Sequence, residues 1–404
     1  MAVALRGLTP LKRILWVLLW VASASGAVAA AAAPIRIGEI NPLTGRLANH
    51  GIEIHEGILY AVEEANAAGG IGGRPLELVS RDDQSLAEVA VNQAEDLILR
   101  EHVVGLVGGY VDAMVGPISQ LAARYRTPYV ASASLQRALT EGRPNPYFFR
   151  VSSLEGVTAP LSRFVLEVVQ PGKVAILHAA TPGATELSQE LRERFDQAKL
   201  PLAMVEKFRP GTTDFSPFLL KVREAGVDVL IVNGFLADHL ILVRQLRELR
   251  VPLKAYIGPW GVAYPSFTAE LGAAADGLVG MCAWDPEITL AGTEAESQRL
   301  VEGFRRRFGK VPSTTSMHGY SSARALLAAL QQVAASGRQP TGEALSQALR
   351  GLDLKLPMER LQFDAAGDPL TYQQVMVQIQ NGRMLAVYPR ERAAAEFKPM
   401  PPLD

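Results

Sequence analysis

The sequence has little that would support metal, thiol or nucleic-acid chemistry. Its 404 residues include one cysteine, Cys282, and six histidines without metal-ligand spacing, so we predict no metal site and no cofactor. A single thiol cannot form an internal disulfide, so burial of apolar side chains must stabilise the fold. Its 40 Lys and Arg residues balance 41 Asp and Glu residues. Balanced charge of this kind does not favour nucleic acid or an anionic membrane as a partner.

The N-terminus has the composition of a secretory signal peptide. Its first 13 residues carry three basic and no acidic side chains, Ile14–Ala22 is uninterruptedly apolar, and Ser23–Ala33 is almost wholly small. The apolar part is too short to span a bilayer comfortably, although an uncleaved membrane anchor is the alternative. No cysteine lies nearby, so a lipid anchor is not expected. We expect residues 1–33 to be removed on export to the periplasm.

The remaining residues, about 370, exceed what one hydrophobic core usually serves. Short β-branched runs alternate with stretches of helical period, a pattern typical of parallel sheets with crossover helices, and the pattern restarts after Gly156. The sequence therefore predicts an α/β protein of two units. Leu361–Val387 alternates in a two-residue period around Asp364–Gly367 and Asn381–Gly382, which predicts a late β ribbon with hairpin turns. The proline-rich tail from Pro389 is expected to be loosely ordered.

The predicted elements are bounded by residue number as follows. Strands are expected at 35–40, 76–80, 103–108, 128–132, 147–151, 173–178, 202–207, 227–233, 255–258 and 278–281. Helices are expected at 54–67, 87–99, 115–125, 161–169, 186–199, 215–224, 238–249, 294–308, 321–336 and 342–350.

Two short motifs invite a catalytic interpretation. Gly69–Gly73 is glycine-rich but follows a helix and precedes a strand, which is the wrong order for phosphate binding, so a turn is favoured. Gly319–Ala323 has a weak likeness to a nucleophile elbow, but a helix-capping serine is favoured because no strand precedes it. The one nucleophile–base pair that can be constructed is Ser134 with His178, which otherwise lies at a core edge or pocket rim. No enzymatic activity is predicted.

The loops that follow the predicted strands have a different composition. In open α/β sheets, ligands bind beyond the carboxyl ends of the strands. These loops mix glycine, small hydroxyls, aromatic residues and one acid, as expected of a pocket with a few placed polar groups. They cover residues 41–45, 108–113, 132–135, 178–181, 234–236 and 258–261.

Several segments resemble those of one known family. They include IRIGEINPLTGRLANHG, NAAGGIGG, YFFRVSS, KVAILH, DFSPFLLKVREAGVD and YIGPWG, and they follow one another through nearly the whole chain after the leader. The sequence is similar to the type I periplasmic binding proteins of the branched-chain amino acid (Leu/Ile/Val) group. The resemblance implies two Rossmann-like lobes, joined by a three-segment hinge, that close on a small-molecule solute. It also implies membrane permease subunits of an ABC transporter as partners, and we expect a monomer.

The family's architecture implies boundaries for the lobes. Lobe one would combine residues 35–154 with 285–362, and lobe two 155–284 with 363–388, leaving 389–404 as a C-terminal tail. The crossings between the lobes would fall near 151–155, 283–286 and 362–364.

The resemblance also implies a ligand site, from which this sequence departs. Family members that hold an α-amino acid bind its carboxylate at positions that match Asp112, Ala133, Ser134 and Leu135, and bind its ammonium group with a glutamate where Trp260 stands here. An aromatic expected after His178 is replaced by Gly183. The candidate ligand-binding residues are His50, Tyr110, Asp112, Ala133, Ser134, Leu135, Thr181, Gly183, Phe235 and Trp260.

These departures disfavour a free α-amino acid. An acid in a cleft rimmed by Tyr110, Phe235 and Trp260 suits a ligand with a cationic or hydrogen-donating head, because aromatic faces attract cations by ~0.5–2 kcal/mol. Alternatively, Asp112 points away and bonds N–H groups of its own loop. For Trp260 the alternative is a place on a lobe surface, and the pocket is favoured because a Gly-Pro-x-Gly loop frames it. Tyr110 and Phe235 could equally be core at strand ends. We therefore expect an aromatic, amine or amide ligand; the functional alternative is a ligand-sensing lobe of a signalling system.

Overall fold

The computed structural model describes residues 33–142 and 145–401, and Pro34–Asp404 forms one compact unit. Apart from Ala33, the predicted leader lies outside the described residues. Within this unit, two large β-sheets carry the fold, together with a short two-stranded pair, β11 (Leu354–Lys355) and β12 (Arg360–Leu361).

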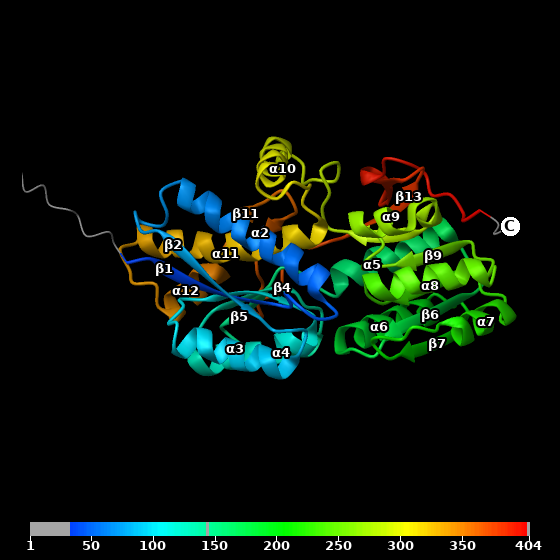
Figure 1. Cartoon of the computed structure of the whole chain (residues 1–404), viewed down its shortest axis with the longest axis horizontal. Helices are drawn as coiled ribbons and strands as arrows, with labels where there is room; N and C mark the ends of the chain where they lie inside the picture. The colour runs from blue at the N-terminus through cyan, green and yellow to red at the C-terminus, as the bar shows by residue number, and fades with distance from the viewer. Residues whose placement is uncertain (1–32, 143–144, 402–404) are drawn as a thin grey trace, which may run out of the picture. The chain divides into compact units, whose positions relative to one another are not determined.

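The first sheet has five parallel strands in the order β2-β1-β3-β4-β5. Its strands are β1 (Ile35–Asn41), β2 (Leu76–Asp82), β3 (Leu106–Tyr110), β4 (Tyr129–Ala133) and β5 (Phe148–Arg150). Figure 1 shows helices on both faces, a pair formed by α2 (Ala48–Ala67) and α11 (Thr314–Ala335) on one side and a pair formed by α3 (Ala87–Leu99) and α4 (Asp112–Tyr125) on the other. A parallel sheet covered in this way buries its inner strands on both faces, which explains the apolar runs of β1, β3 and β4, whereas the edge strand β2 is only partly buried.

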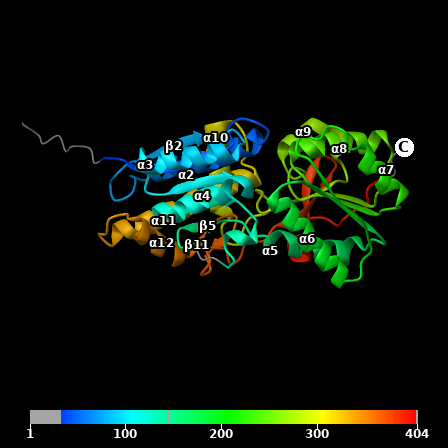
Figure 2. The same ribbon diagram turned by 90° about the horizontal axis from the view of Figure 1, so that it is seen from below.

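The second sheet has the order β14-β13-β10-β9-β8-β6-β7, and only β13 and β14 run antiparallel to their neighbours. Its strands are β6 (Val174–Ala179), β7 (Leu202–Phe208), β8 (Val229–Asn233), β9 (Ala255–Gly258), β10 (Val279–Cys282), β13 (Val375–Gln380) and β14 (Arg383–Tyr388). Figure 2 shows the flanking helices on two sides. They are α5 (Glu155–Phe164) and α6 (Pro182–Gln197) on one side and α7 (Ser216–Glu224), α8 (Leu236–Glu248) and α9 (Pro265–Leu271) on the other. The fold is thus the predicted α/β type with two sheets.

The remaining helical segments are short or lie outside these layers. They are α10 (Glu294–Phe308), α12 (Gly342–Arg350), the 3₁₀ turns η1 (Arg137–Leu139), η3 (Gly272–Ala275) and η4 (Arg390–Arg392), and a π-helical turn, η2 (Val165–Val169).

The turn predictions are confirmed at two places. The glycines of Gly69–Gly73 have positive φ angles, which only glycine adopts readily, so this segment is a turn. Asn381 and Gly382, with φ of 52° and 73°, join β13 to β14 as a hairpin. The turn at Asp364–Gly367 joins two residues of an isolated β-bridge, Phe363 and Pro369. The prediction that the β ribbon extends through this turn is therefore wrong.

Several helices begin earlier than predicted: α2 begins at Ala48 rather than at residue 54, α5 at Glu155 rather than at 161, and α11 at Thr314 rather than at 321. Helix α11 starts at Thr314 because the Ser313 side chain caps it and accepts a hydrogen bond from the Ser316 N–H at 3.1 Å. Gly319–Ala323 therefore lies inside the helix, and the prediction of a capping serine in that motif is wrong. Helix α9 was not predicted at all.

The tail after Pro389 is packed, contrary to expectation. The side chain of Gln378 in β13 donates to the Lys398 carbonyl at 2.6 Å and accepts from the Lys398 N–H at 3.0 Å. Met400 is buried, and its N–H donates to the Lys254 carbonyl. The side chain of Gln378 thus holds the tail in place. The proline content of the tail does not predict this contact.

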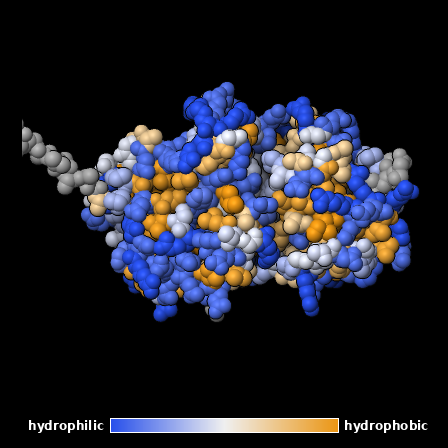
Figure 3. Space-filling model, viewed as in Figure 1, coloured by the Kyte–Doolittle hydropathy of each residue, from blue (hydrophilic) through white to orange (hydrophobic). Residues whose placement is uncertain are grey.

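The surface and core are clearly separated. Hydrophilic side chains surround smaller apolar areas on the face seen in Figure 3. The large apolar side chains that are well exposed among the described residues come from α2, the two ends of α3, η2 and the loop before β13: Ile52, Leu86, Leu99, Val168 and Leu370. Within the described part of the chain, no helix has the length and apolar character needed to cross a membrane.

Candidate ligand-binding site

A strained turn at the end of β3 places two candidate residues. Gly108 and Gly109 have φ of 97° and 89°, and Val111 has φ of 66°, an unusual conformation for a β-branched residue. The side chain of Asn41 holds the turn by accepting from the Gly109 N–H at 2.9 Å. Backbone strain of this kind is concentrated at functional sites. Here the turn directs Tyr110 and Asp112 toward a common cavity.

Residues that follow strands of both sheets line this cavity. The cavity has a volume of about 70 Å³. This is several times the roughly 10–15 Å³ that one buried water molecule needs. Nine of the ten predicted residues line it, namely Tyr110, Asp112, Ala133, Ser134, Leu135, Thr181, Gly183, Phe235 and Trp260. The carboxyl ends of parallel strands therefore converge here, as the loop composition led us to expect.

Asp112 was expected either to face the ligand or to bond backbone N–H groups of its own loop, and its contacts combine features of both. Its Oδ1 accepts hydrogen bonds from the Ser134 hydroxyl at 2.8 Å and from the N–H groups of Leu135 and Gln136 at 2.9 and 2.8 Å. These donors belong to the loop after β4, not to its own loop. The side chain nevertheless lines the cavity. One carboxylate oxygen is thus fully engaged by the first-sheet side.

The other carboxylate oxygen faces helix α6. A Cβ atom at position 183 would lie 2.2 Å from Asp112 Oδ2, so only glycine fits in this arrangement. Gly183 has no positive φ, and its role is therefore close approach rather than turn formation. The place where an aromatic side chain was expected is occupied by the carboxylate of Asp112.

An aromatic cluster closes one wall of the cavity. The ring of His50 stacks on Tyr110 with centroids 4.6 Å apart and meets Tyr264 and Phe235 edge-on at 5.1 and 6.2 Å. His50 does not itself line the cavity; it supports the residues that do. Burial lowers the pKa of His50 to about 3, with a smaller contribution from nearby His239, so the ring is neutral at pH 7.

Two hydroxyl groups of the cavity lining have no free proton to offer a solute. The Ser134 hydroxyl donates to Asp112, and the Ser152 hydroxyl donates to the Ser134 carbonyl at 3.0 Å, so both protons are committed. Among the described residues, no lysine or arginine lines the cavity. A solute with its own donors or a positive charge therefore matches this lining better than a carboxylate does.

Sequence reasoning missed another group of lining residues. They are Val111, Ser152, Ala184, Tyr264, Met281, Thr314, Thr315, His318, Tyr372 and Gln374. The Ser313 cap could have revealed that the first turn of α11 begins early enough to reach the cavity. Tyr372 and Gln374 precede β13, where no motif points to a ligand.

The proposed nucleophile and base do not meet. Ser134 gives its hydroxyl proton to Asp112, while His178 Nδ1 pairs with the Ala179 carbonyl at 3.0 Å. His178 is buried at the end of β6 and is not part of the cavity lining. Across the described residues, no group of three or more His, Cys, Asp and Glu side chains is placed to hold a metal ion.

A cavity lined by loops from two α/β sheets is the arrangement of a two-lobed binding protein. Comparison with known families agrees: the model of the periplasmic binding protein family matches residues 34–383. The chain belongs to this family, as a type I member of its branched-chain amino acid group. Proteins of this group are periplasmic, bind small solutes and work with ABC transporter permease subunits, and this chain is a substrate-binding component of that kind.

Individual relatives are similar at moderate identity. Leu/Ile/Val-binding protein homolog 7 from Brucella abortus (strain 2308) is 26% identical over 399 residues, covering 94% of this chain and 97% of the relative. The structure of LivJ from Streptococcus pneumoniae with isoleucine has a TM-score of 0.78 at 22% identity, covering 87% of this chain and 97% of that one. A solute-binding protein from R. palustris with benzoate has a TM-score of 0.77 at 19% identity, covering 88% and 95%. The two solved structures thus share the fold, although their ligands differ.

Proposed function

We propose that this protein captures a small solute carrying a hydrogen-donating or cationic head on an apolar or aromatic body, and delivers it unchanged to a membrane permease. The observation that carries the proposal is the cavity itself. Asp112 is its acid, aromatic rings form its walls, and no basic side chain lines it among the described residues. A free α-amino acid would bring its carboxylate toward Asp112 without a cationic partner.

The relatives allow this departure from amino acids. The structure from S. pneumoniae contains isoleucine and the one from R. palustris contains benzoate, so the same fold accommodates unlike solutes. In this protein, the Asp112 carboxylate accepts hydrogen bonds from the N–H groups of Leu135 and Gln136 in the loop after β4. These N–H groups are therefore not free to bind a carboxylate of the solute. Ligand class in this fold is therefore set by the loops.

The proposed capture mechanism is closure of two lobes about a hinge. Lobe one would contain the first sheet with residues 285–362, and lobe two the second sheet. Arg150 pairs with Asp368, and its N–H donates to the Gly367 carbonyl, so the loop at 364–368 belongs with lobe one. We therefore place the third crossing at 369–374 rather than at 362–364. A solute that touches both lobes only in the closed form shifts the equilibrium toward closure.

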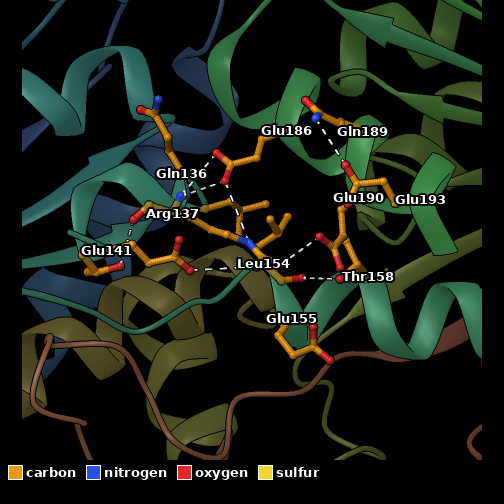
Figure 4. Close-up of polar contacts among 12 residues, drawn as sticks. Gln136, Arg137, Glu141, Leu154, Glu155, Thr158, Glu186, Gln189, Glu190 and Glu193 are labelled. Atoms are coloured by element: carbon orange, nitrogen blue, oxygen red, sulfur yellow. Dashed lines mark hydrogen bonds and ion pairs between the residues drawn. The ribbon is translucent and has the colours of Figure 1, made fainter.

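A polar latch supports closure at the rim of the cavity. Figure 4 shows Arg137 of η1 between Glu141 of its own side and two glutamates of α6. The Arg137 backbone N–H donates to Glu186 at 3.1 Å, and its guanidinium pairs with Glu190 at 2.8 Å. These contacts join elements of the two proposed lobes, so they form only on closure.

Arg137→Ala is expected to weaken solute binding about two- to tenfold. Partly exposed ion pairs contribute about 0.2–1 kcal/mol each, and the change should appear as faster dissociation because closed complexes open sooner. Stopped-flow fluorescence at low and high salt measures this, and the salt dependence of the wild type should diminish in the variant. Arg100→Ala, which breaks an ion pair with Asp96 within one short segment, is the control. Equal dissociation rates for Arg137→Ala and wild type would contradict the latch.

A solute panel tests the proposed function directly. Protein expressed without residues 1–33 is mixed with amino acids, aromatic acids, amines and amides, and thermal unfolding is recorded. A ligand at 100 times its Kd should add about 2.7 kcal/mol to the free energy of unfolding, so amines or amides should give the largest rise in Tm. The compound recovered afterwards should have unchanged mass. If leucine, isoleucine or valine gave the largest rise, the proposed ligand class would be wrong.

A further inference from the structure

A chain of hydrogen bonds runs from α11 to the segment before β13. His318 Nδ1 lies 2.8 Å from the Thr314 carbonyl oxygen, and His318 Nε2 lies 2.9 Å from the Tyr372 hydroxyl. The Gln374 side-chain amide donates to the same hydroxyl at 2.6 Å. All four residues line the cavity, so this chain forms one side of the ligand site.

The donor and the acceptor of each hydrogen bond in this series can be assigned. A carbonyl oxygen only accepts, so Nδ1 of His318 carries the hydrogen. Burial lowers the pKa of His318 to about 4, so the ring is neutral at pH 7 and Nε2 accepts from the Tyr372 hydroxyl. The Tyr372 oxygen is then left to accept, and it receives an N–H of Gln374. The amide of Gln374 cannot be reversed without setting two acceptors against each other.

The fixed orientation of the Gln374 amide leaves its carbonyl oxygen, Oε1, without a donor. Gln374 is 4% exposed, and its Oε1 has no hydrogen-bond partner. Buried carbonyl oxygens almost always find a donor, so an orphan in a cavity lining points to a missing partner. No donor among the described side chains fills this role.

We propose that Gln374 Oε1 accepts a hydrogen bond from an N–H group of the solute, which is therefore a primary amide or an ammonium group on an aromatic-sized apolar body. This inference rests on the proposed solute-binding function and sharpens it. Tyr372 and His318 act as positioning residues that fix the orientation of the Gln374 amide. A ligand without N–H donors would leave that carbonyl unpaired in the closed form.

Benzamide and acetophenone are suitable probes, because they differ mainly by NH₂ against CH₃. Isothermal titration calorimetry on the wild type should show benzamide bound at least about tenfold more tightly than acetophenone. Gln374→Met, which keeps the length of the side chain and removes the acceptor, should abolish this preference while acetophenone still binds. Tyr372→Phe should reduce the preference, because Gln374 then turns freely. Benzylammonium serves as the cationic probe in the same series.

Three results would overturn the inference. Gln374→Met could keep the wild-type preference for benzamide, or it could lose both probes equally, which would indicate a purely structural role. Benzamide and benzylammonium could also fail to bind to a wild-type protein that binds another compound of the panel. Each of these leaves the proposed function standing, whereas a wild-type protein that binds no compound of the panel contradicts that function itself.

Discussion

Gly183→Val is expected to weaken solute binding by more than about 100-fold without disturbing the fold. The new Cβ would lie 2.2 Å from Asp112 Oδ2, well inside van der Waals contact. Asp112 cannot swing aside freely, because Leu135 and Gln136 would lose the acceptor of their N–H groups. Each buried N–H left unsatisfied costs about 1–3 kcal/mol, and every 1.4 kcal/mol is a factor of ten in affinity. In the proposed open form, helix α6 of lobe two would move away from Asp112 of lobe one, so we expect no such clash there.

Calorimetry measures the affinity for the solute, and small-angle scattering measures closure of the lobes. Affinity should fall, and the decrease in radius of gyration on adding solute should disappear. Gly116→Ala is the matched control, since a Cβ there meets Leu139 at an ordinary 3.5 Å. Binding by Gly183→Val within about threefold of wild type would show that closure does not bring these residues together.

Much of the fold was predictable because its strands are buried on both faces. Runs such as Val229–Asn233 are apolar throughout, and the helices between them have one apolar stripe. Elements without that contrast were missed. Helix α9 has only Phe267 fully buried, and the first turn of α11, Thr314–Met317, is largely hydroxyl-bearing although it is buried. Their burial comes from tertiary contacts that periodicity does not record.

The site was predictable wherever it follows a strand. Tyr110, Phe235 and Trp260 were expected in a pocket because parallel strands present their carboxyl ends at one edge, and they line the cavity. Gln374 and His318 were not predicted, since their proximity depends on how the segment before β13 packs on α11. The orientation of a single carboxylate, such as that of Asp112, likewise depends on which N–H groups the neighbouring loop presents.

Acid should weaken solute binding through His50, whose surroundings in the closed form contain no acidic partner for a protonated ring. The ring touches Tyr110, Phe235 and Tyr264, and the nearby His239 is itself neutral because burial lowers its pKa to about 4. Opening of the lobes would part His50 from Phe235 and Tyr264 and return its pKa toward the ordinary 6.5.

The sign and size of this effect follow from linkage. A histidine whose pKa is lower in the closed form favours closure fully above pH 6.5, and that advantage is lost as the pH falls toward the closed-form pKa of about 3. Affinity should therefore decrease by up to about tenfold per pH unit below 6.5, or about 30-fold at pH 5. An amide solute, which does not titrate in this range, makes the profile a property of the protein. His50→Phe keeps the stacked ring without its proton and should flatten the profile between pH 5 and 7.5, whereas His102→Asn on the surface should not. A wild-type profile that is already flat, or one that His50→Phe leaves unchanged, would place the pH response elsewhere.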